Sequence, residues 1–431
     1  LPYIYMMSII LILIFILGYI LITMEHFIGI NKAAFALLIA VISWTILVFN
    51  TSDFTTLFSS LNTHLSNVSE IVFFLLGAMT IVQLIDAHDG FSVIAHKIKT
   101  SNKNKFIWLV ALITFFLSAI LDNLTTTIVM VSILNKLIEN KKTKWYLLGL
   151  VIISSNAGGA FSPIGDVTTT MLWIGGQVTA LNIIKETFLA SLIAMTIPTI
   201  MISHLIKGKI ELLNHLEDNK ESTSFSKSLI LVIGITCLLF VPIFKVMTQL
   251  PPYMGMLFSL SIMWIFTELF HKNNSNRNLY TVSRALEKID TPSILFFFGI
   301  LMSIAALETA HILPHLTNGL NTLFNGDINL IAISIGVLSS LVDNVPLVAA
   351  LQSMYSLNTF HTDHYFWELL AYTAGTGGSC LIIGSAAGVA VMGMEKIDFF
   401  WYLKNISWIA LIGFIAGALS LIIEAAIMHW V

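Results

Sequence analysis

Charged residues are scarce in this sequence of 431 residues. Asp, Glu, Lys and Arg make up 10% of the chain, whereas soluble domains carry roughly a quarter. Hydrophobic residues account for 57%, and the mean hydropathy is +0.88. This composition excludes an ordinary soluble domain and predicts an all-α polytopic membrane protein in contact with the lipid bilayer. We expect no nucleic-acid partner.

Cysteine is nearly absent, and both copies, Cys237 and Cys380, fall inside predicted spans. A disulfide framework is therefore not expected. The His-Glu-x-x-His motif is also missing, and Pro163-Ile164 before Gly165-Asp166 does not fit the Gly-x-Gly-Asp pattern of membrane aspartyl proteases. We therefore expect neither an enzyme nor a bound cofactor.

Apolar runs define the predicted membrane spans, because about 20 residues of helix cross a bilayer core of ~30 Å. The first run lacks the charged start and the small-residue cleavage pattern of a signal peptide, so it is expected to be a span. The ten expected crossings are Ser8 to Thr23, Ala33 to Phe49, Ile71 to Ile85, Leu147 to Ile174, Thr187 to Ile206, Leu229 to Lys245, Tyr253 to Leu269, Ile294 to His311, Trp367 to Met392 and Ile406 to Met428.

Two further apolar regions are bent at an Asp-Asn pair. Phe106 to Ile138 is bent at Asp122-Asn123, and Ile328 to Tyr355 is bent at Asp343-Asn344. Each arm of the first region has about 15 residues and covers roughly 22 Å as a helix, which is less than a crossing. We expect re-entrant hairpins, with a pair of short, tilted crossings as the alternative.

Basic residues lie almost entirely on one side of this arrangement. Nineteen of the 21 fall in loops on one face, and only Lys185 and Lys245 fall on the other. Since basic loops face the cytoplasm, this bias predicts a multi-pass protein of the plasma (inner) membrane with both termini outside.

The two halves of the chain show the same series of motifs. Gly77 matches Gly299 at an offset of 222 residues, the two Asp-Asn pairs match at 221, and Gly158-Gly159 matches Gly377-Gly378 at 219. Each half has five transmembrane helices plus one re-entrant hairpin, and an odd count inverts the second copy. The expected division is a first repeat, 1–206 (scaffold helices 1–69, transport elements 70–206), a cytoplasmic linker, 207–227, and a second inverted repeat, 228–431 (scaffold helices 228–292, transport elements 293–431).

Polar side chains within these apolar surroundings mark the candidate site at the membrane midplane, where the helices are expected to be broken. Unsatisfied polar groups cost several kcal/mol in hydrocarbon, and intramembrane acids are usually functional. The residues expected to bind a cation or protons are Asp122, Asn123, Thr125, Thr126, Ser155, Asn156, Asp166, Thr168, Thr169, Asp343, Asn344 and Ser379.

The chemistry of these residues favours a small cation. Hard oxygen ligands suit Na⁺ or Li⁺, and the site segments contain no Lys or Arg. The first half is richer in such ligands, because Asp166 aligns with Ser385. We place the cation at Asp122, Asn156, Asp166 and Thr168. Burial disfavours the charged form of a carboxylate, so protons are expected to compete with the cation for these acids.

Several motifs resemble the NhaD-type sodium/proton antiporters of the ion transporter superfamily. They are the Asp-Asn hairpin tips, the segment SSNAGGAFSPIGDVTT from Ser154 to Thr169, and Thr376-Gly377-Gly378-Ser379 followed by Gly384 to Gly388. The likeness covers nearly the whole chain. It implies exchange of Na⁺ or Li⁺ for protons, a scaffold plus a transport domain that moves in an elevator-like manner, and a homodimer.

Other ionisable residues are candidates for a proton path or for pH sensing. A histidine at a membrane interface is more often without such a role. The candidates are Glu25, His26, Asp86, His88 and Glu308.

Three other functions compete with cation/proton exchange. An anion carrier of the same superfamily, for arsenite or a dicarboxylate, shares the hairpins and the glycine-rich breaks, but the retained carboxylates argue against it. An intramembrane hydrolase would use paired aspartates as acid and base, and its motifs are missing. A cation channel is disfavoured because duplicated broken helices are typical of alternating access.

Overall fold

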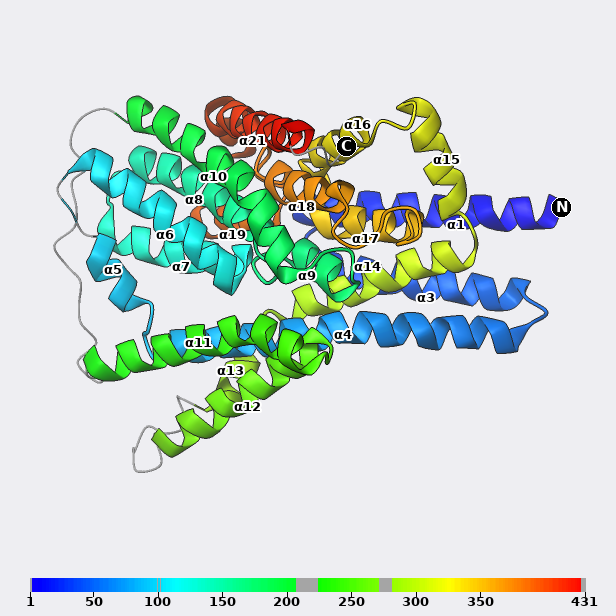
Figure 1. Cartoon of the computed structure of the whole chain (residues 1–431), viewed down its shortest axis with the longest axis horizontal. Helices are drawn as coiled ribbons and strands as arrows, with labels where there is room; N and C mark the ends of the chain where they lie inside the picture. The colour runs from blue at the N-terminus through cyan, green and yellow to red at the C-terminus, as the bar shows by residue number, and fades with distance from the viewer. Residues whose placement is uncertain (1, 99, 101, 207–223, 271–280, 428–431) are drawn as a thin grey trace.

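The computed structural model describes residues 2–98, 100, 102–206, 224–270 and 281–427 (Figure 1). The expectation of an all-α polytopic membrane protein is confirmed, since eight helices within these residues are long and apolar enough to cross a membrane. Most of the expected linker, 207–227, lies outside the described residues. The helices are α1 (Pro2–Thr23), α2 (Glu25–Ile28), α3 (Lys32–Asn50), α4 (Phe54–Ala87), α5 (Ser92–Ile98), α6 (Lys103–Leu121), α7 (Asn123–Leu137), α8 (Lys141–Ala160), α9 (Val167–Ile174), α10 (Ala180–Leu205), α11 (Ser224–Thr248), α12 (Pro252–Phe270), α13 (Val282–Lys288), α14 (Thr291–Thr309), α15 (Leu313–Leu323), α16 (Ile328–Ser339), α17 (Asn344–Met354), α18 (Tyr365–Gly377), α19 (Ala386–Glu395), α20 (Phe399–Tyr402), the π-helical turn η2 (Leu403–Ser407) and α21 (Trp408–Ile427).

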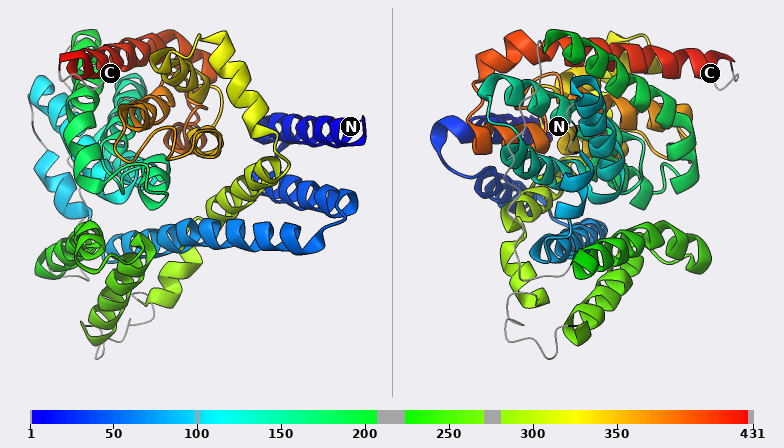
Figure 2. Two further views of the ribbon diagram at one scale, coloured as in Figure 1. Left: turned by 45° about the vertical axis from the view of Figure 1, so that its right-hand side comes forward. Right: turned by 90° about the vertical axis from the view of Figure 1, so that its left-hand side faces the viewer.

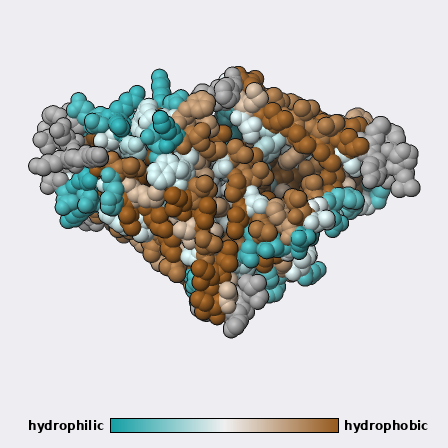
Figure 3. Space-filling model, turned by 90° about the horizontal axis from the view of Figure 1, so that it is seen from above, coloured by the Kyte–Doolittle hydropathy of each residue, from teal (hydrophilic) through white to brown (hydrophobic). Residues whose placement is uncertain are grey.

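The helices gather in two layers. Figure 2 shows α4, α11 and α12 along the lower side and α6 to α10 with α18 and α21 on the upper side. Helix α14 packs against both α3 and α4. Apolar side chains cover much of the face seen in Figure 3, and hydrophilic ones gather toward its edges. Phe49, Leu181 and Met247 are among the exposed apolar residues. An apolar exterior of this extent is expected of helices that face lipid.

Two helices depart from the expected spans. Helix α4 has 34 residues and starts at Phe54, well before the expected crossing Ile71 to Ile85. The sequence did not indicate its first half, because polar residues there lower the local hydropathy. It also continues across residue 70, where the scaffold and transport elements of the first repeat were expected to divide. Helix α15 was not expected, and it meets α16 at a bend of 111°.

The two Asp-Asn hairpins differ in the length of their arms. Helix α6 has 19 residues and starts at Lys103, before the expected start at Phe106. Asn102 caps it there and accepts a hydrogen bond from the amide of Lys105. It is long enough to cross a membrane, so the expectation that its arm falls short is wrong. Helix α7 has 15 residues, and α16 and α17 have 12 and 11. The arms of the second hairpin are therefore short, as expected of a re-entrant loop.

Two of the expected crossings are each divided into two shorter helices. The run Leu147 to Ile174 becomes α8 and α9, and the run Trp367 to Met392 becomes α18 and α19. The first break lies later than the sequence indicated, because α8 continues helically through Gly158-Gly159 to Ala160, whereas α18 ends at Gly377, inside its glycine pair. The first segment therefore unwinds after its glycine pair, and the second unwinds at its own pair.

A serine in each hairpin bonds to the helix that follows the hairpin. The hydroxyl of Ser118 in α6 donates to the carbonyl oxygen of Ser155 in α8 at 2.6 Å. The hydroxyl of Ser339 in α16 donates to the carbonyl oxygen of Ala374 in α18 at 2.7 Å. Each bond joins the first arm of a hairpin to the broken helix beside it, so the two halves of the chain make the same contact.

The glycine pairs permit close contact at the same two places. A Cβ atom on Gly158 would lie 2.1 Å from the carbonyl oxygen of Phe115 in α6, and one on Gly377 would lie 2.0 Å from that of Gly336 in α16. No side chain fits at such distances from backbone. The glycines thus allow each broken helix to lie directly on its hairpin.

Adding a methyl group at either glycine should separate these helices. We expect Gly158→Ala and Gly377→Ala to lower the free energy of unfolding by about 1–3 kcal/mol, the usual cost of overpacking. The midpoint of thermal unfolding in detergent measures this loss. Gly393→Ala is the matched control, since nothing lies within 4 Å of its added Cβ, and it should match the original protein or unfold at a higher temperature. A Gly158→Ala protein as stable as this control would contradict the packing argument.

Candidate functional site

Four short helices begin near one another, and each has an oxygen-bearing residue at its N-cap. Asp122 caps α7, Asp166 caps α9, Asp343 caps α17 and Ser385 caps α19, each accepting a bond from a backbone N–H of its own helix. Short polar residues are favoured at this position, because the first N–H groups of a helix lack internal partners. The sequence therefore brings three carboxylates and one hydroxyl to four helix starts.

The carboxylate of Asp166 is the centre of the polar cluster. It is 1% exposed. One oxygen accepts from the amide and the hydroxyl of Thr168, at 2.8 and 2.6 Å. The other accepts from Nδ2 of Asn123 at 2.5 Å, and Nδ2 of Asn344 lies 3.3 and 3.4 Å from the two oxygens. Both hairpin tips thus donate to one acid, as a buried ionised carboxylate requires.

Asn156 connects the cluster to the second half of the chain. Its Oδ1 accepts from Nδ2 of Asn123 at 3.1 Å. Its Nδ2 donates to the hydroxyl oxygens of Ser379 at 2.9 Å and Ser385 at 3.0 Å. Asn156 is fully buried, and both the oxygen and the nitrogen of its side-chain amide have hydrogen-bond partners. The predicted residues Asn123, Asn156, Asp166 and Ser379 are therefore joined in one network.

Asp122 faces the same cluster without a hydrogen bond to it. Asp122 and Asp166 line one cavity of about 20 Å³, which has room for about one water-sized particle. Within the described residues, the Asp122 carboxylate accepts from the amide and hydroxyl of Thr125, both at 2.8 Å, and forms no ion pair. Two acids thus border one small enclosed space.

Asp343 lies differently from Asp122. Its carboxylate accepts from Nζ of Lys32 at 2.8 Å, in an ion pair whose side chains are 12% and 19% exposed. Lys32 is the first residue of α3, and it also lies 4.1 Å from the ring centroid of Phe296. The sequence had given Lys32 only as a loop residue, and no local signal links it to a carboxylate 311 positions away.

Of the three remaining predicted hydroxyls, two form hydrogen bonds with described residues. The hydroxyl of Thr169 donates to the backbone oxygen of Asp166 at 2.9 Å, and Ser155 accepts from Thr127 at 2.9 Å. Thr126 is fully buried, and its hydroxyl has no partner among the described residues. Of these hydroxyls, that of Thr126 is the one left without a bond.

The candidates for a proton path whose side chains are described do not form one cluster. Asp86 is exposed at the end of α4, and His88 follows it in the turn that ends the helix, with its Nδ1 2.6 Å from the carbonyl oxygen of Leu84. Glu308 lines a cavity of about 470 Å³ elsewhere, together with His64. The side chain of the predicted residue His26 lies outside the described part of the structure.

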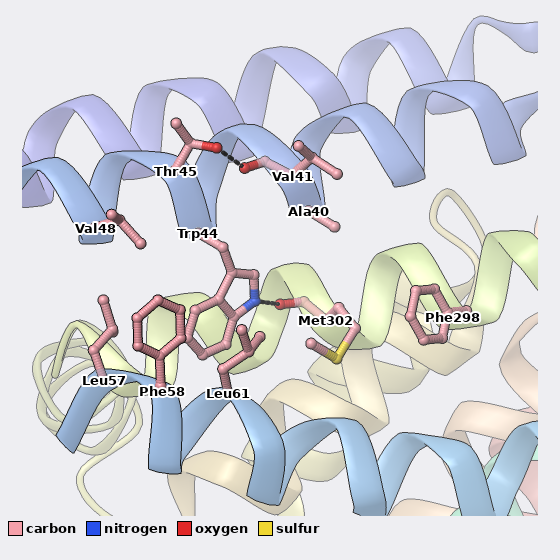
Figure 4. Close-up of a pocket in the computed structure, with 10 residues that line it drawn as sticks. All are labelled: Ala40, Val41, Trp44, Thr45, Val48, Leu57, Phe58, Leu61, Phe298 and Met302. Carbon is pink, nitrogen blue, oxygen red and sulfur yellow. Dashed lines mark hydrogen bonds between the residues drawn. The ribbon is translucent and has the colours of Figure 1, made fainter. Parts of the chain in front are cut away.

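A third cavity approaches the cluster from α1 and α3. It has a volume of about 290 Å³ and is lined by Glu25, Lys32, Asp343 and Ser385 among others. Ser385 accepts from Asn156, so this space ends one hydrogen bond away from the network. An open apolar groove between α3, α4 and α14 lies apart from it, and there the Trp44 indole donates to the carbonyl oxygen of Met302 (Figure 4).

Comparison with known proteins gives a consistent set of relatives. A family model described as citrate transporter matches residues 19–377. Sodium/proton antiporter 1 of Arabidopsis thaliana is 46% identical over 412 residues, covering 94% of this chain and 70% of that protein. Sodium/proton antiporter 2 of the same plant is 44% identical, covering 95% and 97%. The Na⁺/H⁺ antiporter NhaD of Vibrio cholerae is 28% identical, covering 97% and 91%.

Proposed function

The chain belongs to the citrate transporter family, as an NhaD-type member of it, and from this membership we propose that it exchanges Na⁺, and also Li⁺, for protons across a membrane. The observation that supports this most is the enclosed space bordered by two acids, Asp122 and Asp166. Either a cation or protons neutralise these acids, and their competition couples the two fluxes.

The charges at the helix starts favour a cation over an anion. The N-terminus of a helix carries a partial positive charge, so helix starts without acids would bind an anionic substrate. Here Asp122, Asp166 and Asp343 cap three of the four helices. Asp343 is paired with Lys32, but the charges of Asp122 and Asp166 offset the partial positive charges of the helix starts and would repel a carboxylate or oxyanion. This argument favours Na⁺ over the alternative of arsenite or a dicarboxylate.

The bound cation would take its oxygens from the groups around Asp166. Asn123 now donates to this carboxylate, so a cation at the same oxygen would displace its Nδ2, and rotation of the amide would present Oδ1. Asn156 and the hydroxyl of Thr168 lie within the same network. Oxygen sets of this kind suit small hard cations. A proton on Asp166 would displace the same donor, so the two occupants exclude each other.

The duplicated contacts support an inverted repeat that alternates access to this site. Each hairpin lies on a broken helix through one serine and one glycine, as at Ser118 with Gly158 and at Ser339 with Gly377. In inverted-repeat transporters, such elements move together around a site at the midplane. We propose a transport unit built from the hairpins and broken helices, in a homodimer in the plasma (inner) membrane with both termini outside.

The experiment that tests this function uses inside-out membrane vesicles that contain the protein. After a pH gradient is formed, Na⁺, Li⁺ or K⁺ is added, and a pH-sensitive dye reports the gradient. We expect Na⁺ and Li⁺ to collapse the gradient and K⁺ to leave it, with vesicles lacking the protein as the control. No response at neutral or alkaline pH by correctly inserted protein would contradict the proposal, and arsenite and dicarboxylate uptake would then be measured.

Competition at the carboxylates also fixes the direction of the pH dependence. At low pH the acids hold protons. If one proton competes with Na⁺, the Na⁺ concentration for half-maximal exchange should rise by about tenfold for each unit by which the pH falls. The maximal rate at saturating Na⁺ should stay nearly constant. Initial rates measured against Na⁺ at several pH values give both quantities. A falling maximal rate with constant half-saturation would place the protons at another site.

A further inference from the structure

The two hairpin tips share the Asp-Asn sequence but not the same electrostatic partner. Asp343 forms an ion pair with Lys32, whereas Asp122 borders a cavity with Asp166 and forms no ion pair within the described residues. Lys32 comes from α3, on the opposite side of the repeat boundary from Asp343. The second tip is therefore already neutralised by a cation that belongs to the protein.

The contacts around Lys32 hold its ammonium group in place. Nζ is 2.8 Å from Asp343 and 4.1 Å from the ring centroid of Phe296 in α14. The backbone N–H of Lys32 donates to Oε1 of Glu25 at 3.2 Å. The Asp343 carboxylate and the Phe296 ring both attract a cation, and the backbone of Lys32 is held by Glu25. Together these contacts favour one position for the charge.

This position is next to the route into the polar cluster. Lys32 and Asp343 line the cavity of about 290 Å³ that also contains Ser385. Ser385 in turn accepts from Asn156. A free carboxylate at Asp343 would attract cations into this space, and an unpaired ammonium group there would repel them from Asp166.

We propose that Lys32 is a tethered cation that occupies the carboxylate of the second hairpin, so that the exchanged cation binds only at the first. This inference rests on the proposed cation/proton exchange and deepens it. Lys32 is a positioning residue in this arrangement: it neutralises Asp343 and ties the start of α17 to the start of α3. Asp343, which the sequence placed among the cation ligands, then serves as the partner of Lys32.

A double-mutant cycle in the vesicle assay tests this inference. Lys32→Gln leaves the Asp343 carboxylate free to attract cations and should lower the half-saturating Na⁺ concentration by about tenfold. Asp343→Asn leaves the Lys32 ammonium group unpaired and should raise that concentration by about tenfold. The double variant removes both charges and should return within about twofold of the original protein. Lys32→Arg keeps the positive charge and should retain exchange.

The opposite result has a clear signature. If Asp343 binds the exchanged cation, the double variant will be as impaired as Asp343→Asn, and the inference is overturned. Lys144→Gln with Glu395→Gln is the matched control, because this ion pair of 3.4 Å lies on other helices. Its single and double variants should all resemble the original protein.

Two measurements keep the test decisive. Thermal unfolding in detergent shows whether each variant is folded, and stabilisation by added Na⁺ reports binding without transport. A folded double variant that Na⁺ stabilises as it does the original protein supports the inference, and one that Na⁺ no longer stabilises overturns it. Absence of Na⁺-driven exchange in the original protein would instead reject the proposed function, so the two failures are distinguishable.

Discussion

Asp166→Asn should abolish Na⁺-driven proton movement while the protein remains folded in the membrane. The substitution removes the charge at the centre of the network and keeps the size of the side chain. Loss of one partner from a buried charged contact costs about 3 kcal/mol, which corresponds to an affinity for Na⁺ lower by about 100-fold. The vesicle assay at increasing Na⁺ measures this change.

The geometry around Asp166 gives a second reason for a large effect. Nδ2 of Asn123 lies 2.5 Å from one carboxylate oxygen, and Nδ2 of Asn344 lies within hydrogen-bond distance of both. An asparagine here places its own NH₂ group against one of these donors, so the network must rearrange. The variant therefore loses the charge and the arrangement of its ligands together.

Asp398→Asn is the matched control for this substitution. Asp398 is exposed and caps α20, accepting from the amide of Trp401 at 2.9 Å, so the same change is made at another N-cap away from the cluster. Asparagine and aspartate are almost equivalent as caps. The control should keep full exchange. Full exchange by Asp166→Asn as well would remove this acid from the cation site.

Much of the fold follows from the sequence, because long apolar runs and polar interruptions are local signals. The break after α8 lies further along than expected, since a glycine pair can serve close helix packing as well as unwinding. Gly158 remains helical because its missing side chain accommodates the backbone of Phe115, a contact that only the tertiary structure reveals. The first half of α4 was missed because polar residues lower the local hydropathy there, and only Leu57 and Val68 of it are buried.

The polar cluster was predictable for a similar reason. Asn123, Asn156 and Asp166 lie in apolar segments, where unpartnered polar groups are costly, so their meeting was expected. Lys32 was not predictable, because it lies at a helix start among loop residues and its partner is 311 positions away. Charge alone was a weaker signal for the proton-path candidates. Asp86 lies exposed at the end of α4, whereas Glu308 lines a cavity elsewhere.

Asp122→Asn should also lower Na⁺-driven exchange by about 100-fold, with little effect on folding. Asp122 has φ of 86° and ψ of 158°, a backbone conformation that is costly for residues other than glycine and is concentrated at functional sites. Asparagine tolerates positive φ better than most residues, and its Oδ1 can still accept from the amide of Thr125. The substitution therefore removes the charge and the acceptor of the Thr125 hydroxyl but keeps the backbone cap of α7.

Asp122→Gly separates the charge from the backbone strain. Glycine removes the cap and the charge but adopts the observed φ without cost. We expect both variants to lose exchange to a similar extent, while only Asp122→Gly loses the hydrogen bond from the backbone amide of Thr125 that caps α7. Thermal unfolding measures the second effect. Exchange by Asp122→Gly that equals the original protein would show that Asp122 serves the backbone and not the cation.

The double variant Asp122→Asn with Asp166→Asn shows whether the two acids act on one occupant. They border a single cavity of about 20 Å³, so one cation or one set of protons can engage both. Residues that share a partner are strongly non-additive, and the double variant should then be no worse than the more impaired single variant. If the residual rate of the double variant equals the product of the residual fractions of the two single variants, the acids bind their occupants separately.

Asp166 accepts from three side chains and Asp122 from one. We therefore expect Asp122, which has the fewer competing donors, to release its proton after Asp166 does, so that the cation binds first at Asp166 and then engages both acids.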